Sequence, residues 1–213
     1  MDPGKRRFKT GVTLIELIIY AGLSLLLLGL LFYLLWPSAR ASGVATAKVR
    51  LHQMATNVLT KLGRDLATSN ASAVSLLDSA AAPQPNGLAL VQARGLTASG
   101  QTSWQTEAIC YLFLPEQGRV VRQLCPPEPP SVVFLASRPA LLSASDLLAV
   151  AQNSNQTRRT LAQQVTRFEV FHEGDTRARV VSPLRVRIRL EADVPGRTAP
   201  EVFELERTFA LRD

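Results

Sequence analysis

The chain has 213 residues, a mass of 23.2 kDa and 46% hydrophobic residues, which is enough for one soluble domain plus an appendage. Its formal net charge of +7 would suit a partner such as nucleic acid or an acidic membrane surface. Four of the basic residues lie within residues 1–11, and removing that segment leaves 20 basic and 16 acidic residues, a net charge of +4. A balance this mild does not by itself indicate a nucleic-acid-binding protein.

An uncharged, leucine-rich run extends from Leu17 to Trp36. As a helix, these 20 residues would cross about 30 Å of hydrocarbon. Basic residues between Lys5 and Lys9 precede the run and predict a cytoplasmic amino terminus. A secretory signal peptide would have a shorter apolar stretch with its cleavage site at the far end. Here the glycine suited to processing, Gly11, comes before the apolar run, so we expect a membrane anchor.

Glu16 places a carboxylate at the edge of this apolar run. A carboxylate at bilayer depth is costly unless it is paired with an opposite charge. The sequence therefore predicts either a partner cation for Glu16 or a position at the membrane interface.

The segment Gly11-Val12-Thr13-Leu14-Ile15-Glu16-Leu17 resembles the prepilin processing signature of type IV pilins and type II secretion pseudopilins. The resemblance implies that a membrane aspartic peptidase, the prepilin peptidase, cuts between Gly11 and Val12 and that Val12 is then N-methylated. It also implies that Glu16 pairs with the terminal amine of a neighbouring subunit during assembly. The family usually has phenylalanine where Val12 stands.

The helix is expected to continue beyond the apolar run, with a bend or a locally melted turn at Pro37. From Val44 onward, apolar residues recur at helical spacing and define one face, and the cluster from Thr68 to Ser72 predicts the end of the helix. The predicted buried face consists of Leu51, Ala55, Val58, Leu62 and Leu66. His52, within the same helix, is expected to be structural or solvated.

After a turn at Asp78–Gly87, the pattern changes from helix to strand. Strands are predicted at Leu88–Gln92, Ile109–Leu114, Arg119–Leu124 and Val165–Phe171, a weak helix at Ser145–Ala151, a loop at Asn153–Arg159, and a departure from the sheet at Pro126–Pro130. The segment from Pro115 to Gly118 reads as the four-residue turn of a hairpin.

The chain has two cysteines, Cys110 and Cys125, near the open end of the predicted hairpin. On the oxidising side of a membrane they would be able to form a disulfide, which in the chain-entropy model contributes about 3 kcal/mol. With no histidine nearby they make a poor metal site, and no cofactor is expected.

The last strand pair has a clear period of two, with Val186 and Ile188 alternating with Arg185, Arg187 and Arg189. If residues 191–200 form the connection, Val186 is expected opposite Leu205 and Ile188 opposite Phe203. In that register, Arg187 would meet Glu204 and Arg185 would meet Glu206. Such pairing favours a charge-balanced sheet surface over a nucleic-acid-binding stripe, which needs uncompensated basic residues.

A long helix followed by antiparallel strands predicts an α+β fold in which the sheet packs on the exported half of the helix. The expected divisions are a leader at 1–11, a membrane helix at 12–36, its amphipathic continuation at 37–70 and a β-rich body at 71–213. This layout agrees with the lollipop fold of pilins.

Two further segments resemble larger minor pilins of the W-type and pseudopilins of the J-type: Gly63-Arg64-Asp65-Leu66 and Phe209-Ala210-Leu211-Arg212-Asp213. That resemblance implies a subunit at the filament tip that helps assembly to start. The implied partners are other pilins or pseudopilins, the prepilin peptidase, the inner-membrane assembly platform and, before assembly, membrane lipid.

Three alternatives remain. An enzyme is not expected, because no phosphate loop, zinc-binding pair or nucleophile elbow is present, and the two histidines, His52 and His172, belong to different predicted elements. A tip subunit that binds DNA or a surface is compatible with the pilin interpretation. An ordinary single-span membrane protein would keep its leader. The patterns do not distinguish a pilus from a DNA-uptake or secretion filament.

Overall fold

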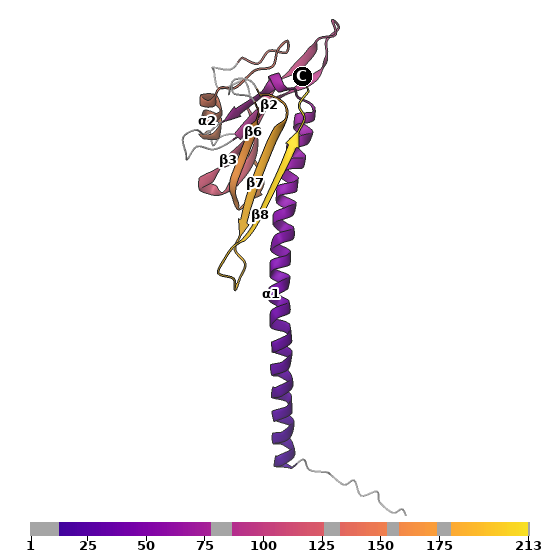
Figure 1. Cartoon of the computed structure of the whole chain (residues 1–213), viewed down its shortest axis with the longest axis vertical. Coiled ribbons are helices and arrows are strands. Elements are labelled where there is room, and N and C mark those ends of the chain that lie inside the picture. The colour runs from indigo at the N-terminus through magenta and orange to yellow at the C-terminus, as the bar shows by residue number, and fades with distance from the viewer. Residues whose placement is uncertain (1–12, 78–86, 126–132, 153–157, 174–179, 213) are drawn as a thin grey trace, which may run out of the picture. The chain divides into compact units, whose positions relative to one another are not determined.

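The computed structural model describes residues 13–77, 87–125, 133–152, 158–173 and 180–212 (Figure 1). The chain divides into two compact units, Met1–Ala45 and Thr46–Asp213, and helix α1 (Leu14–Ala67) contributes to both. The predicted turn at Asp78–Gly87 lies, up to residue 86, outside the described residues, as does the predicted departure from the sheet at Pro126–Pro130. The overall class is α+β, as the sequence predicted.

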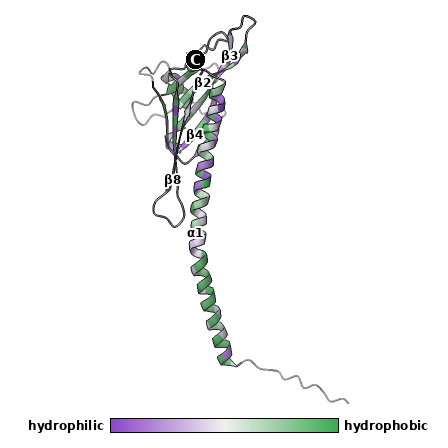
Figure 2. Cartoon of the chain, turned by 45° about the vertical axis from the view of Figure 1, so that its right-hand side comes forward, coloured by the Kyte–Doolittle hydropathy of each residue, from purple (hydrophilic) through white to green (hydrophobic). Residues whose placement is uncertain are grey.

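In the first unit, the described chain is helical from Leu14 to Ala45. Pro37 lies inside the helix, and the residues on both sides of it remain helical, so the prediction of a melted turn was wrong. A proline in a helix removes one backbone hydrogen bond. The hydrogen bonds of the turns on either side keep the backbone helical despite this loss. Figure 2 shows that the first part of α1 consists mostly of hydrophobic residues.

The second unit contains two antiparallel sheets. The five-stranded sheet has the order β1-β2-β3-β4-β5, and the three-stranded sheet has the order β6-β7-β8. The strands of the first sheet are β1 (Val74–Leu77), β2 (Gly87–Leu96), β3 (Thr102–Leu114), β4 (Arg119–Cys125) and β5 (Arg158–Gln163). Those of the second are β6 (Val165–His172), β7 (Leu184–Ala192) and β8 (Glu201–Phe209); the short helices are η1 (Ala71–Ala73), η2 (Pro115–Gln117) and α2 (Ala144–Gln152).

The hairpin between β3 and β4 has the predicted turn. The turn consists of η2 and Gly118, whose φ of 56° places it in the left-handed region that glycine adopts readily.

The predicted loop at Asn153–Arg159 was wrong at its end, because Arg158 and Arg159 belong to β5. β5 is the last strand of its sheet, and Ala162 is its only fully buried residue, so its sequence has no apolar alternation.

The last hairpin pairs two residues away from the predicted register. Ile188 lies opposite Leu205 and Arg187 opposite Glu206, whereas Val186 lies opposite Arg207. The ladder extends to Ala192 opposite Glu201, so the connection is shorter than expected. A shift of two residues leaves every side chain on its predicted face, which is why the alternation alone did not fix the register.

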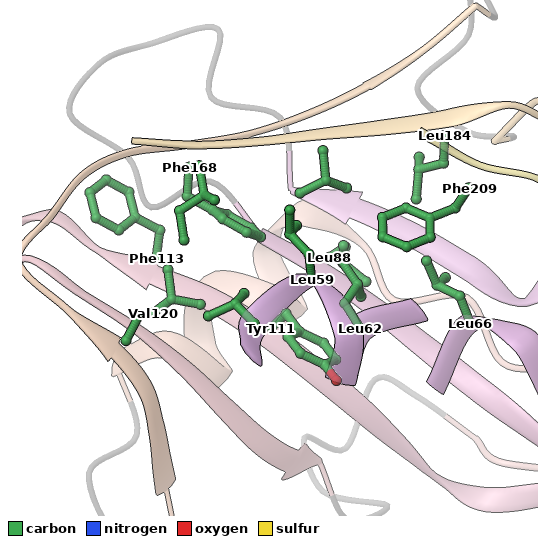
Figure 3. Close-up of a cluster of buried hydrophobic side chains, with 14 of the residues drawn as sticks. Leu59, Leu62, Leu66, Leu88, Tyr111, Phe113, Val120, Phe168, Leu184 and Phe209 are labelled. Atoms are coloured by element: carbon green, nitrogen blue, oxygen red, sulfur yellow. The ribbon is translucent and has the colours of Figure 1, made fainter. Parts of the chain in front are cut away.

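One apolar core joins α1 to both sheets (Figure 3). The predicted face of α1 is fully buried and packs against strand residues that include Tyr111, Phe168 and Leu184. A second core on the other side of the five-stranded sheet contains both cysteines and is covered by α2 residues such as Leu147. The second half of α1 is therefore an integral part of the body.

Residues 63–66 and 209–212 meet in this core; Asp213 lies outside the described residues. A Cβ atom added at Gly63 would lie 2.9 Å from Cε1 of Phe209, so the absence of a side chain lets the ring approach the helix closely. Beyond the helix, the backbone N–H of Ala71 donates to the carbonyl of Arg212 over 2.9 Å. The carboxyl-terminal segment is thus fixed to the end of α1.

Candidate functional site

The start of α1 is closed by a reciprocal pair of hydrogen bonds between Thr13 and Glu16. The backbone N–H of Thr13 donates to Oε2 of Glu16 over 3.2 Å, and the backbone N–H of Glu16 donates to Oγ1 of Thr13 over 3.3 Å. The Thr13 hydroxyl also donates to Oε2 over 3.2 Å. This arrangement is a capping box, which satisfies two helix-terminal donors and typically stabilises a helix start by about 1 kcal/mol.

The cap supplies no positive charge to Glu16. Within the described residues, the Glu16 carboxylate accepts hydrogen bonds only through Oε2, and Oε1 has no partner. The side chains around it are apolar and exposed: Leu14 is 80% and Leu17 63% accessible. The two residues of the predicted cleavage site, Gly11 and Val12, lie outside the described residues. Glu16 therefore presents one carboxylate oxygen on an apolar, uncovered helix end.

The apolar run that follows is not covered by its own chain. Helix α1 is long and apolar enough to cross a membrane (Figure 2). None of its 18 most apolar consecutive residues is buried. The large side chains from Leu17 to Trp36 are all more than half exposed. An all-round apolar surface of this kind needs lipid or other helices around it.

Asp65 is the buried polar centre of the body. Its side chain is 7% exposed and accepts a hydrogen bond of 2.5 Å from the Tyr111 hydroxyl and one of 2.8 Å from Nε of Arg122. Tyr111 and Arg122 lie opposite each other on β3 and β4. Lys61, one turn earlier on α1, places its ammonium 3.7 Å from the other carboxylate oxygen. The cluster joins the helix to the centre of the five-stranded sheet.

Burial and charge act together on the partners of Asp65. Burial raises the pKa of Tyr111, and the hydrogen bond to the Asp65 carboxylate raises it further, so the phenol stays protonated. Burial disfavours the charged form of Arg122, but the hydrogen bond and charge of Asp65 outweigh this effect and raise its pKa. The cluster therefore holds one negative carboxylate between a neutral phenol and a cation, an arrangement that suits a structural clamp.

Cys110 and Cys125 are fully buried thiols in the structure. They lie on neighbouring strands, with Cys110 opposite Gln123 and Cys125 opposite Ala108. A hydrogen bond with Cys125, together with burial, raises the pKa of Cys110. The two side chains are thus close neighbours on one face of the sheet, and their oxidation to a disulfide stays a prediction.

The arginine row of β7 is balanced by carboxylates. Arg187 lies within 4.0 Å of Glu169, 3.4 Å of Glu204 and 2.8 Å of Glu206, and Nη2 of Arg189 is 3.0 Å from Glu191. The predicted charge pairing is confirmed at Arg187, and Arg189 also has a carboxylate partner. Because of the register shift, however, Arg185 lies opposite Thr208 and not opposite Glu206.

The two histidines do not come together. His52 stacks on Phe203 with ring centroids 5.3 Å apart, at an open groove of about 320 Å³ between α1 and β8. His172 ends β6 opposite Leu184. The groove also contains an ion pair between Lys48 and Glu201 at 3.3 Å, so its two charged side chains are paired with each other.

No family model, curated protein or solved structure matches this chain. The structure gives Glu16 a local partner and places both cysteines together. The sequence also held two signals that went unused: Thr13 and Glu16 have the spacing of a capping box, and Asp65 is a carboxylate on the buried side of a helix.

We predict that Asp65→Ala lowers the free energy of unfolding of the body by about 3 kcal/mol, because it leaves a buried phenol and a largely buried guanidinium without their acceptor. Tyr111→Phe removes one hydrogen bond and should cost about 1 kcal/mol. Lys61→Ala is the matched control, since its exposed ion pair should contribute less than about 1 kcal/mol. Denaturant unfolding of the full chain in detergent, followed by circular dichroism, measures all three. An unchanged midpoint for Asp65→Ala would contradict the clamp.

The raised pKa of Tyr111 predicts a loss of stability in alkali. A group whose pKa is higher in the folded state stabilises the fold fully below its unfolded pKa, which for tyrosine is about 10. The free energy of unfolding should therefore be constant in this respect below about pH 10 and fall as the pH rises further. Unfolding measured across this range should show a smaller fall in Tyr111→Phe than in the wild type. Equal slopes for the two proteins would rule out a titrating Tyr111.

Proposed function

We propose that this chain is a pilin-like subunit, a minor pilin or pseudopilin that enters a type IV pilus-like filament through the first part of α1. The observation that carries the proposal is Glu16, a carboxylate on an otherwise apolar helix whose surface its own chain leaves uncovered. In the proposed pathway, the prepilin peptidase cuts after Gly11 and the new amino terminus at Val12 is methylated. The subunit then passes from membrane lipid into the filament at the inner-membrane assembly platform.

The capping box is compatible with a second partner for Glu16. It uses Oε2, so Oε1 can accept a hydrogen bond from a cation without loss of the cap. A terminal amine from a neighbouring subunit would supply the missing positive charge. Two opposite charges in an apolar environment compensate for their lost hydration when the geometry is good and hydrogen bonds satisfy both groups. The preformed cap holds the carboxylate in place for that pairing.

The resemblance of Gly63–Leu66 and Phe209–Asp213 to larger minor pilins supports a subunit that helps to initiate or cap the filament. The filament would serve pilus biogenesis, motility, adhesion, DNA uptake or type II secretion. A DNA-binding tip subunit gains no specific support from the β7 arginines, because Arg187 and Arg189 have carboxylate partners. The structural role is therefore the principal proposal.

The mature amino terminus tests the proposal most directly. We predict that mass spectrometry of protein purified from a host with a prepilin peptidase finds a chain that begins at methylated Val12. The same protein from a host without the peptidase should retain residues 1–11 and serves as the control. A chain that begins at Met1 in both hosts would identify an ordinary single-span membrane protein and overturn the proposal.

Variants at the helix start separate charge pairing from capping. Glutamine can replace glutamate in a capping box, so Glu16→Gln keeps the cap and loses only the charge, whereas Glu16→Ala loses both. We predict that both variants insert into the membrane but are absent from sheared filaments, as measured by immunoblotting. Thr13→Ser, which keeps the hydroxyl, should assemble normally.

Other results for the two Glu16 variants would contradict charge pairing. If Glu16→Gln enters filaments as well as the wild type while Glu16→Ala does not, the residue acts only as a helix cap. Normal incorporation of Glu16→Ala would show that neither its charge nor its cap is needed for assembly.

A further inference from the structure

Trp36 and Arg40 form a contact at the far end of the apolar run. The guanidinium carbon of Arg40 lies 5.2 Å from the centroid of the Trp36 ring, one helical turn away. Trp36 is 62% exposed, and Tyr33, three residues before it, is 79% exposed. The spacing of these three residues places them on one face of α1. Two amphipathic aromatic rings and a cation thus share one side of the helix where the apolar run ends.

The position of this contact matches the thickness of a bilayer. Residues 17–39 contain no charged side chain, so Arg40 is the first charge after Glu16. Trp36 lies 20 positions after Glu16, which corresponds to a rise of about 30 Å in a helix, the thickness of the hydrocarbon core. If Glu16 lies at one boundary of the hydrocarbon, Trp36 lies at the other. Tryptophan and tyrosine concentrate at that depth because their rings are apolar and their N–H or O–H groups reach water.

The geometry of the contact leaves Arg40 able to bind an anion. The guanidinium carbon of Arg40 lies over the Trp36 ring, and a contact with the ring face leaves the five N–H donors of the guanidinium for other partners. Within the described residues, no carboxylate pairs with Arg40. In-plane guanidinium N–H groups match two oxygens of a phosphate, and the ring restricts the rotamers of Arg40, which lowers the entropy cost of binding.

We infer that Trp36 and Arg40 form a lipid-headgroup site that fixes the depth of α1 in the membrane, with the guanidinium on a phospholipid phosphate and the indole at the hydrocarbon boundary. The occupant is lipid and not a second copy, because the apolar surface of the run is uncovered on all sides and is not restricted to one seam. This inference rests on the membrane-spanning part of the proposed function and does not depend on processing or filament entry.

Depth-dependent fluorescence quenching tests the site in the full chain reconstituted into phosphatidylcholine vesicles, with and without phosphatidylglycerol. The chain has two tryptophans, and Trp104 is buried in the body. Trp36→Phe, which retains only Trp104, gives the signal to subtract. We expect lipids spin-labelled at the headgroup to quench Trp36 more strongly than lipids labelled near the bilayer centre.

Arg40 variants test the phosphate contact. In Arg40→Gln, Trp36 should move toward the bilayer centre, with a blue-shifted emission and a larger share of quenching by the deep label. Arg40→Lys keeps the charge but loses the planar guanidinium. The depth of Trp36 in this variant should therefore still depend on phosphatidylglycerol, but it should not reach the wild-type value. Ser38→Ala, at the same boundary but without charge, should leave the depth unchanged.

Three results would overturn the inference: equal or stronger quenching by the deep label in the wild type, no effect of Arg40→Gln on depth, or quenching that falls as the protein-to-lipid ratio rises. The last result would mean that a second copy covers Trp36. These measurements are made on unprocessed protein. If mass spectrometry finds no chain that begins at Val12, the filament proposal is contradicted, but this inference is not.

Discussion

The body depends on the contact between one face of α1 and the five-stranded sheet, and Asp65 is the polar point within that contact. The apolar stripe decides which face of α1 meets the sheet, but leucine and valine contacts have little directionality and tolerate small rotations of the helix. A carboxylate that must reach both Tyr111 and Arg122 restricts the rotation further, since displacing Asp65 would leave these groups without their partners. The hydrogen bonds thus select one arrangement among those that the apolar packing would allow.

The same helix carries a second carboxylate in the opposite situation. Asp65 has hydrogen-bond donors from two strands and little contact with water, whereas Glu16 is exposed and has only its own cap. The difference follows from the two surfaces of α1. From Leu51 onward one side is apolar and is covered by the sheets, but before Trp36 all sides are apolar and none is covered by the chain. Asp65 completes the fold of the body, whereas Glu16 has no opposite charge beside it within the described residues.

The sequence was sufficient where a pattern has one physical solution. The buried face of α1 followed from helical spacing, and the β3–β4 hairpin followed from Pro115 and Gly118, whose backbone preferences suit that turn. It was insufficient where several solutions satisfy the same pattern. The predicted β7–β8 register was wrong by two residues, because alternation does not distinguish shifts of two. Strand β5 was not predicted, because it buries a single alanine and so has no apolar alternation. Asp65 was visible as a residue, but its partners lie 46 and 57 positions away, beyond the reach of local spacing.

The two segments that resemble minor pilins, one in α1 and one at the end of the chain, pack against each other. Their resemblance can therefore be explained by the fold of the body. Gly63 gives Phe209 room against the helix, and the chain after Phe209 hydrogen-bonds to the residues that follow α1. The fit between Gly63 and Phe209 is a packing requirement of this body. These segments therefore support the fold more directly than the proposed place at a filament tip. Glu16 is different, because its hydrogen bonds within the described residues all go to Thr13, and the proposal of a filament subunit depends on its carboxylate.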